Sequence, residues 1–167
     1  EIVTDLTKKH NHEPVLVRHM LALIGSARNG ITYSALSAMI LEDREVCTEF
    51  SKSIRHPLSK PQLPIVIWSR LFYDLAPYLI SSWRFGEEVL SFAYDCFQSY
   101  SLTHCVFPEL VGLARAVYQP DDRNASSITM QGLSELPHLL LSHCDPLEYV
   151  RLACQPPYLQ RKLENNL

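Results

Sequence analysis

The sequence predicts a mainly α-helical chain that also contains one short pair of β-strands. Apolar residues recur at helical spacing through most of the chain, and prolines and polar turns divide these stretches into short helices. Two short apolar runs on either side of a glycine predict the strands. With 167 residues, 47% of them hydrophobic, the chain is long enough to bury one substantial core.

The composition disfavours several classes of partner. The net charge of -3 is spread without blocks, so the chain lacks the clustered Lys and Arg that bind nucleic acid. It contains no signal peptide and no apolar run of 18 residues, so no membrane partner is expected. Because the chain opens on Glu1, we expect a piece of a longer polypeptide. The five cysteines are odd in number and widely spaced, which indicates reduced thiols and a cytoplasmic location: Cys47, Cys96, Cys105, Cys144 and Cys154.

Residues typical of helix ends predict the first two helices. Residues 1–12 carry little periodicity and are predicted to form an N-terminal arm. Pro14 suits the first turn of a helix that ends near Gly25 or at the turn of residues 28–30. Thr32 is the expected N-cap of a second, short helix. The inward stripe of that helix is predicted to be Leu36, Met39 and Ile40.

A third helix is predicted over residues 63–79. It follows a charged and then Ser-, Lys- and Pro-bearing stretch, residues 42–62, which we predict to be a long connector. Pro64 lies where a first helical turn tolerates proline, and Pro77 is expected to end or kink the helix because its ring clashes with the preceding turn. Apolar runs around Gly86 then predict a β-hairpin.

The order helix, short helix, long helix, hairpin is that of a winged helix, a variant of the helix-turn-helix. We therefore predict a winged-helix domain, three helices plus a β-hairpin wing, over residues 13–95. Residues 96–167 show further helical spacing with a break near Pro108, which predicts a helical bundle or the start of a helical array. The prolines expected to separate these helices are Pro137, Pro146, Pro156 and Pro157.

The third helix is apolar on most of its sides, and only Ser69, Arg70 and Asp74 form a narrow polar strip. We expect Arg70 to pair with Asp74, four residues on. A helix of this kind must be covered, and the second half of the chain is the expected cover. The residues predicted to hold this helix in a core or interface are Pro64, Trp68, Leu71, Phe72, Leu75, Pro77 and Leu79.

A DNA-binding winged helix is the alternative function. In such a domain the third helix enters the major groove and presents Arg, Lys, Asn or Gln to base edges. Here that helix offers only Arg70, with Arg84 in the hairpin and Arg55 in the connector as further cations. A role in the core is therefore the favoured interpretation of the third helix.

Four stretches of the sequence fit short motifs that occur together, in this order, in one known family. The segment "ARNGITYSALSAMIL" fits a "G-(I/L)-T-x-x-x-L" turn and helix, and "LPIVIWSRLFYDLAPYL" fits an "L-P-x-x-x-W-x-x-L" helix that ends in "P-(F/Y)-L". Further on, "GLSELPHLLLSH" is similar to "R-A-L-x-E-L-P-x-H-L", except that residues 130–132 depart from its start, and "PYLQRKLENN" is similar to an "F-L-x-x-K" end. In this order the stretches resemble the winged helix and following helices of STAND-class NTPases of the NACHT and WD-repeat type.

The resemblance implies a non-catalytic regulatory and interaction module. In such proteins the module relays nucleotide state and packs against the neighbouring nucleotide-binding and repeat domains of the parent chain. The parent would bind ATP or ADP, whereas this chain contains no "G-x-x-x-x-G-K-(S/T)" loop. The resemblance therefore assigns this chain no cofactor and no catalytic or metal-binding residue.

The spacing of the histidines and cysteines matches no metal-binding or catalytic motif. A lone His10-x-His12 in a polar arm is ordinarily solvated. His104-Cys105 and His143-Cys144 place ligand types side by side, but adjacent residues on a helix do not face each other. Cys96 and Cys105 lie among apolar residues, which raise the pKa of a thiol, so we expect inert core cysteines. A hydrolase that uses Cys and His is the least favoured class.

Overall fold

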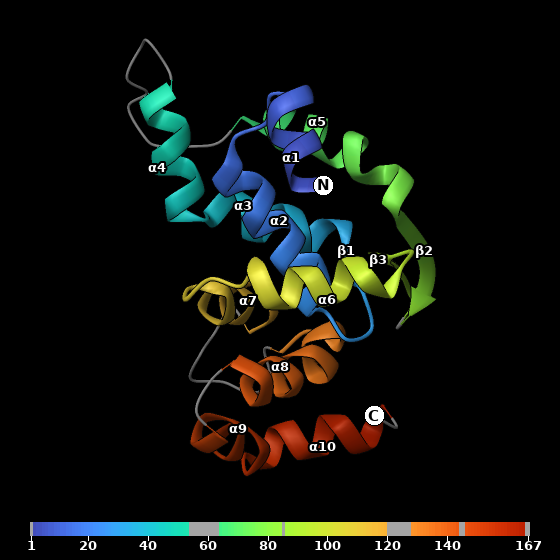
Figure 1. Ribbon diagram of the computed structural model, residues 1–167. Coiled ribbons are helices and arrows are strands. Elements are labelled where there is room, and N and C mark those ends of the chain that lie inside the picture. The colour runs from blue at the N-terminus through green and yellow to red at the C-terminus, as the bar shows by residue number, and fades with distance from the viewer. Residues whose placement is uncertain (1, 54–63, 85, 120–127, 144–145, 166–167) are drawn as a thin grey trace.

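The computed structural model describes residues 2–53, 64–84, 86–119, 128–143 and 146–165. The chain is mainly α-helical and carries a small antiparallel sheet (Figure 1). The helices are α1 (Ile2–Thr4), α2 (Pro14–Ser26), α3 (Tyr33–Glu42), α4 (Arg44–Ser53), α5 (Ile65–Leu75), α6 (Asp95–His104), α7 (Leu110–Tyr118), α8 (Met130–His143), α9 (Pro146–Ala153) and α10 (Pro156–Glu164). A π-helical turn covers Asp5–Lys9, and a 3-10 turn covers Ala76–Tyr78.

The sheet has three strands in the order β1-β3-β2. Strand β3 (Glu87–Phe92) lies in the middle and pairs antiparallel with β2 (Leu79–Arg84) from Leu79 opposite Phe92 to Arg84 opposite Glu87. On its other side β3 pairs with the two-residue strand β1 (Ile31–Thr32). The predicted hairpin is therefore confirmed, and it gains a third strand from the segment just before α3.

Helix α2 forms the centre of the core. From Leu16 to Ser26 every side chain except that of Arg18 is buried, because α6 covers one side of this helix and α3 and α4 cover others (Figure 1). Gly25 permits the closest approach of α6, since a Cβ atom there would lie 2.7 Å from the Cβ of Ser101. One cluster of buried apolar residues runs from Leu6 to Tyr158, so residues on both sides of the predicted boundary at 95 share a core.

The structure corrects the predicted arm and connector. The N-terminal arm is helical, and Leu6 is buried in the core cluster. Residues 44–53 of the predicted connector form helix α4, and residues 54–63 lie outside the described part of the chain. The backbone N–H groups of Glu45 and Val46 donate to Asp43 Oδ1 at 2.9 and 3.1 Å, so Asp43 caps the start of α4.

Pro137 does not divide the second half as predicted, because α8 continues through it. A proline in a helix leaves the carbonyl four residues earlier without its usual N–H partner. Here that carbonyl belongs to Leu133, and the hydroxyl of Tyr158 donates to it at 3.3 Å from α10. The breaks expected near Pro108, Pro146 and Pro156 are confirmed by the starts of α7, α9 and α10. Within the described residues, every helix is too short or too polar to cross a membrane.

Candidate coupling site

The predicted interface residues of the third helix divide by exposure. Trp68, Leu71 and Leu75 are fully buried on one side of α5. Phe72 and Leu79 are half-buried, whereas Pro64, at the N-cap, and Pro77, in the 3-10 turn, are exposed. The ring of Tyr33 from α3 lies 4.9 Å from the Trp68 ring and 5.2 Å from the Phe72 ring, measured between centroids. The buried side of α5 therefore rests on the start of α3.

The expectation that the second half covers α5 is wrong. Helices α7–α10 lie on the opposite side of α2 and α3 from α5 (Figure 1). As a result, Ile65, Val66 and Tyr73 are 59%, 70% and 75% exposed. Only the side that carries Trp68 is sealed within the described residues, and the opposite side of α5 presents apolar side chains to the surface.

The N-terminal arm holds the remaining edge of α5. His12, which we expected to be solvated, is buried, and its Nε2 lies 2.6 Å from Asp74 Oδ2. His10 Nδ1 lies 3.2 Å from the same oxygen, and Arg70 donates to the carbonyl of His10 at 2.5 Å. The hydrogen bond from His12 lowers the pKa of Asp74. Arg70 and Asp74 therefore both bind the arm, instead of forming the expected pair.

A buried polar contact between the two predicted parts of the chain lies at the turn between α2 and β1. Glu135 of α8 is fully buried, and its carboxyl group accepts hydrogen bonds from this turn. The donors are the backbone N–H groups of Arg28 and Asn29, at 2.7 and 3.1 Å, and the side-chain amide of Asn29, at 3.1 Å. The same Asn29 amide also donates to Ser134 at 2.7 Å.

A second side chain of α8 extends this contact by one helical turn. The amide of Gln131 donates to the carbonyl of Gly30 at 2.8 Å and accepts from the hydroxyl of Thr32 at 3.1 Å. Thr32 also accepts from the backbone N–H of Ala35, so the predicted N-cap of the second helix is confirmed. We call residues 28–32 together with Gln131, Ser134 and Glu135 the loop clamp.

Burial sets the electrostatics of the loop clamp. It raises the pKa of Glu135 above its ordinary value, although the N–H groups of Arg28 and Asn29 act in the opposite direction. Burial, reinforced by the nearby Glu135, also raises the pKa of Tyr118 at the end of α7. A cavity of about 230 Å³ borders the clamp between Thr32, Gln131 and the hairpin. The clamp is thus a buried polar contact with one edge close to solvent.

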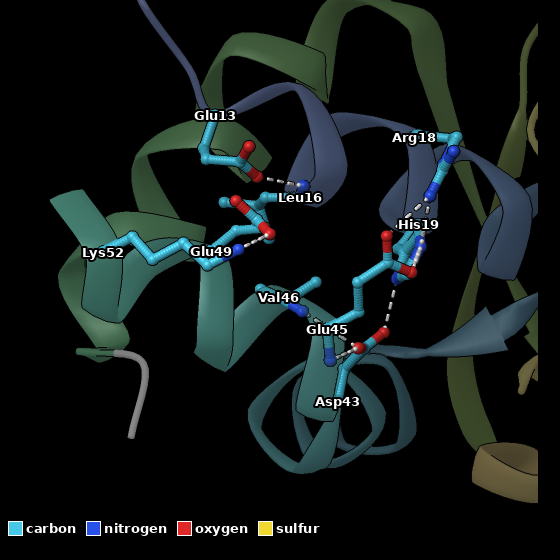
Figure 2. Close-up of polar contacts among 9 residues, drawn as sticks. All are labelled: Glu13, Leu16, Arg18, His19, Asp43, Glu45, Val46, Glu49 and Lys52. Carbon is cyan, nitrogen blue, oxygen red and sulfur yellow. Dashed lines mark hydrogen bonds and ion pairs between the residues drawn. The ribbon is translucent and has the colours of Figure 1, made fainter. Parts of the chain in front are cut away.

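A buried histidine anchors the start of α4 in a similar way. Figure 2 shows His19 from α2 and Asp43 pointing toward one another, with His19 Nδ1 2.6 Å from Asp43 Oδ2. His19 Nε2 lies 3.2 Å from both Arg18 Nη2 and Glu45 Oε2. The His19 ring stacks on Phe107 at 3.7 Å between centroids. His19 and Asp43 are both buried, and this cluster holds α2, α4 and the segment before α7 together.

The cysteines and histidines gather no set of metal ligands among the residues that the structure describes. Cys47 and Cys105 are buried, and burial raises the pKa of the Cys105 thiol as expected. Cys96 was expected to be a core residue, but it is exposed at the start of α6. Cys144 lies outside the described residues.

Sequence reasoning missed the loop clamp, although a signal for it was present. Glu135 is the one carboxylate on a helix face otherwise made of Leu133, Leu136, Leu139 and Leu140. A charged side chain at such a position is almost never fully buried unless it is paired. The "ELP" of the family-like pattern contains this residue, but the pattern alone does not reveal its partner at residues 28–29. No family model, curated protein or solved structure matches this chain.

Proposed function

We propose that this chain is a non-catalytic regulatory and interaction module of a STAND-type signalling NTPase. In this proposal a winged helix, followed by a helical segment, packs against the neighbouring nucleotide-binding and repeat domains. It relays the nucleotide state of the parent protein in the cytoplasm. ATP or ADP binds elsewhere in that parent, and the module itself contributes no catalytic residue.

The connectivity of the first part supports the winged-helix assignment. Helix α2, strand β1, helices α3 and α5 and the β2-β3 hairpin follow one another in that order, and the sheet order is β1-β3-β2. A compact helical group with an antiparallel hairpin attached as a wing is the arrangement expected for this variant of the helix-turn-helix. Helix α4, which lies between α3 and α5, is an addition to the three expected helices.

The loop clamp is the observation that carries the proposal. A relay needs a firm link between the part that receives a movement and the part that passes it on. The turn before β1 belongs to the winged helix and is held by three side chains of α8 through hydrogen bonds of 2.7–3.1 Å. A displacement of α8 must therefore either move this turn or break buried hydrogen bonds.

The DNA-binding alternative receives less support. Arg55 lies outside the described residues, and Arg70 is engaged with the arm. Arg84 is exposed, but it lies opposite Glu87 in a hairpin that also exposes Glu88. The exposed face of α5 is mainly apolar and does not offer the polar side chains that read base edges.

The test uses the full-length polypeptide that carries this module. Amide hydrogen exchange of residues 28–32 and of α8 is measured with ADP bound and with a non-hydrolysable ATP analogue bound. We expect exchange in these segments to differ between the two states, and Glu135→Gln to abolish the difference while nucleotide binding is kept. The exposed Glu88→Gln is the matched control and keeps the difference. Identical exchange in the two nucleotide states, or failure to bind nucleotide, contradicts the proposal.

A further inference from the structure

The cavity beside the loop clamp has an apolar floor. Its volume of about 230 Å³ lies below the roughly 300–1,000 Å³ of pockets for drug-sized ligands, so it suits a smaller molecule. The floor consists of buried side chains from α3, β3 and α7, namely Ala35, Val89 and Tyr118. The half-buried Val117 and Met130 also line it. The cavity can therefore hold a short aliphatic group out of water.

Two opposite charges lie at the mouth of this cavity. Arg84 and Glu87 both line it, both are exposed, and they lie opposite each other in the β2-β3 hairpin. Neither side chain forms a hydrogen bond or an ion pair with a residue that the structure describes. They are also the only charged residues among the described residues that line the cavity. The mouth thus offers one cation and one anion from adjacent strands, whose backbones lie roughly 5 Å apart.

Both parts of the chain contribute to the mouth. The exposed hydroxyl-bearing residues Ser34, in the first turn of α3, and Thr129, just before α8, line it together with the two charged residues. Thr32 and Gln131 line it as well, but the hydrogen bonds of the loop clamp already engage their side chains. A molecule in this cavity would therefore contact the predicted winged helix and the helical segment at the same time.

We propose that this cavity binds a free α-amino acid with a short aliphatic side chain. The carboxylate of the ligand binds the guanidinium of Arg84, and its ammonium group binds the carboxylate of Glu87. The aliphatic side chain enters the apolar floor. Arginine suits this role because it binds a carboxylate through two parallel hydrogen bonds. The inference goes beyond the proposed function, because it needs neither a nucleotide nor a neighbouring domain.

The two charges at the mouth select this class of ligand. A simple amine would meet the like charge of Arg84, whereas a carboxylic acid or a phosphate would meet the like charge of Glu87. A peptide without a carboxylate next to its amino group would satisfy Glu87 alone. A molecule that carries both charges close together satisfies both side chains, and an aliphatic tail adds the contact with the floor.

The experiment follows the backbone amide NMR signals of the isotopically labelled chain during titration with four small molecules. L-leucine carries both charges and an aliphatic tail, whereas isopentylamine lacks the carboxylate, isocaproate lacks the ammonium group and glycine lacks the tail. We expect leucine to bind at least about tenfold more tightly than each of the other three, because each of these lacks one of the three contacts. The signals that shift should include those of Ala35, Val89 and Met130.

Two variants assign the charged contacts. We expect Arg84→Gln to weaken leucine binding by about tenfold and to remove the preference for leucine over isopentylamine. Glu87→Gln should remove the preference for leucine over isocaproate in the same way. Glu88→Gln, at an exposed neighbouring position outside the cavity lining, is the matched control and leaves leucine binding unchanged. Thermal unfolding of each variant checks that the fold is kept.

Four outcomes overturn the inference. They are a leucine titration that does not saturate, equal affinity for all four molecules, shifts confined to residues away from the cavity, and leucine binding that neither Arg84→Gln nor Glu87→Gln weakens. The comparison of the four molecules on the unaltered chain does not depend on any variant. Because the isolated chain is used without nucleotide, failure here leaves the relay proposal standing, and failure of the nucleotide-dependent exchange leaves this binding site standing.

Discussion

At the scale of single residues, Glu135 forms a buried polar link between the two parts of the chain. Its carboxyl group accepts three N–H donors from Arg28 and Asn29. A buried donor that loses its acceptor costs about 1–3 kcal/mol. The sequence alone identified Thr32 as an N-cap, because that signal is local. It did not identify Glu135 as a partner of residue 28, because their separation of more than 100 residues is bridged only by the tertiary fold.

The first prediction concerns Glu135→Gln. At neutral pH we expect the free energy of unfolding to fall by about 1–3 kcal/mol, because an amide NH₂ group would replace an acceptor that faces an N–H donor. The exposed Glu88→Gln should change it by less than about 0.5 kcal/mol. Urea titrations followed by circular dichroism measure both. A loss for Glu135→Gln no larger than that of the control would show that the clamp contributes nothing.

The second prediction concerns how the stability difference between the wild type and Glu135→Gln depends on pH. Burial raises the folded-state pKa of Glu135 above the ordinary value of 4.5, so the native state holds this proton more tightly than the unfolded chain does. The stability that this group contributes is therefore largest below pH 4.5 and declines as pH rises through the folded pKa. The difference in unfolding free energy between wild type and Glu135→Gln should therefore shrink as the pH rises from 4.5 through the folded-state pKa. A difference that grows as the pH rises would contradict the raised pKa of Glu135.

Gly30 supports the clamp through its backbone. Its φ of +86° lies in the left-handed region, and an added Cβ would lie 2.9 Å from the carbonyl oxygen of Leu90. We expect Gly30→Ala to lower the free energy of unfolding by about 2 kcal/mol, since the left-handed conformation alone costs an L-residue about 1–2 kcal/mol. Gly112→Ala, inside α7 with open space around it, should instead raise it by roughly 0.5–1 kcal/mol. Chemical denaturation of the two variants compares them directly, and equal effects would contradict this account.

At the scale of elements, the apolar character of α5 was predicted correctly and its cover was not. Helical spacing places Trp68, Leu71 and Leu75 on one side, and these residues are buried. Ile65, Val66 and Tyr73 lie on the exposed face, because α7–α10 pack on the far side of α2 and α3 (Figure 1). Hydrophobicity indicates that a surface needs a partner but does not say whether that partner belongs to the same chain.

The two tryptophans of the chain provide a matched test of this division. We expect Trp68→Ala to lower the free energy of unfolding by about 3–5 kcal/mol, because the side chain is fully buried against Tyr33 and Phe72. Trp83→Ala removes the same side chain from a position that is 75% exposed, so its effect should be below about 1 kcal/mol. Thermal and urea unfolding of both variants measure the two losses of stability. Equal losses would contradict the assignment of the buried side of α5.

Helices α4 and α8 show where local signals misled. The stretch after Asp43 is polar, so its helical spacing at Val46 and Phe50 was outweighed by the charges and by the prolines that follow. Asp43 caps this helix and is itself fixed by His19, a contact that no local pattern shows. Pro137 was predicted to interrupt α8, but Tyr158 supplies a donor for the carbonyl that the proline leaves free. Hydrogen bonds between distant residues thus fix the start of α4 and allow α8 to continue through Pro137.

At the scale of the whole molecule, the predicted winged helix and helical segment form one body. The buried apolar cluster runs through both parts, α6 packs closely on α2, and the loop clamp joins α8 to the turn before β1. The order of most helices and the hairpin followed from periodicity and from proline and glycine positions. The way in which the two parts join did not, because it depends on buried polar pairs that lie far apart in the sequence.

The most direct test of this union is the unfolding of the chain in urea, followed by tryptophan fluorescence and by far-ultraviolet circular dichroism. Trp68 and Trp83 both lie before residue 95, whereas the circular dichroism signal includes α6–α10. We expect one transition with the same midpoint for both signals, and we expect Glu135→Gln, a change in α8, to shift both midpoints equally. Two separate transitions, or a shift confined to circular dichroism, would contradict the claim that the two parts form one unit.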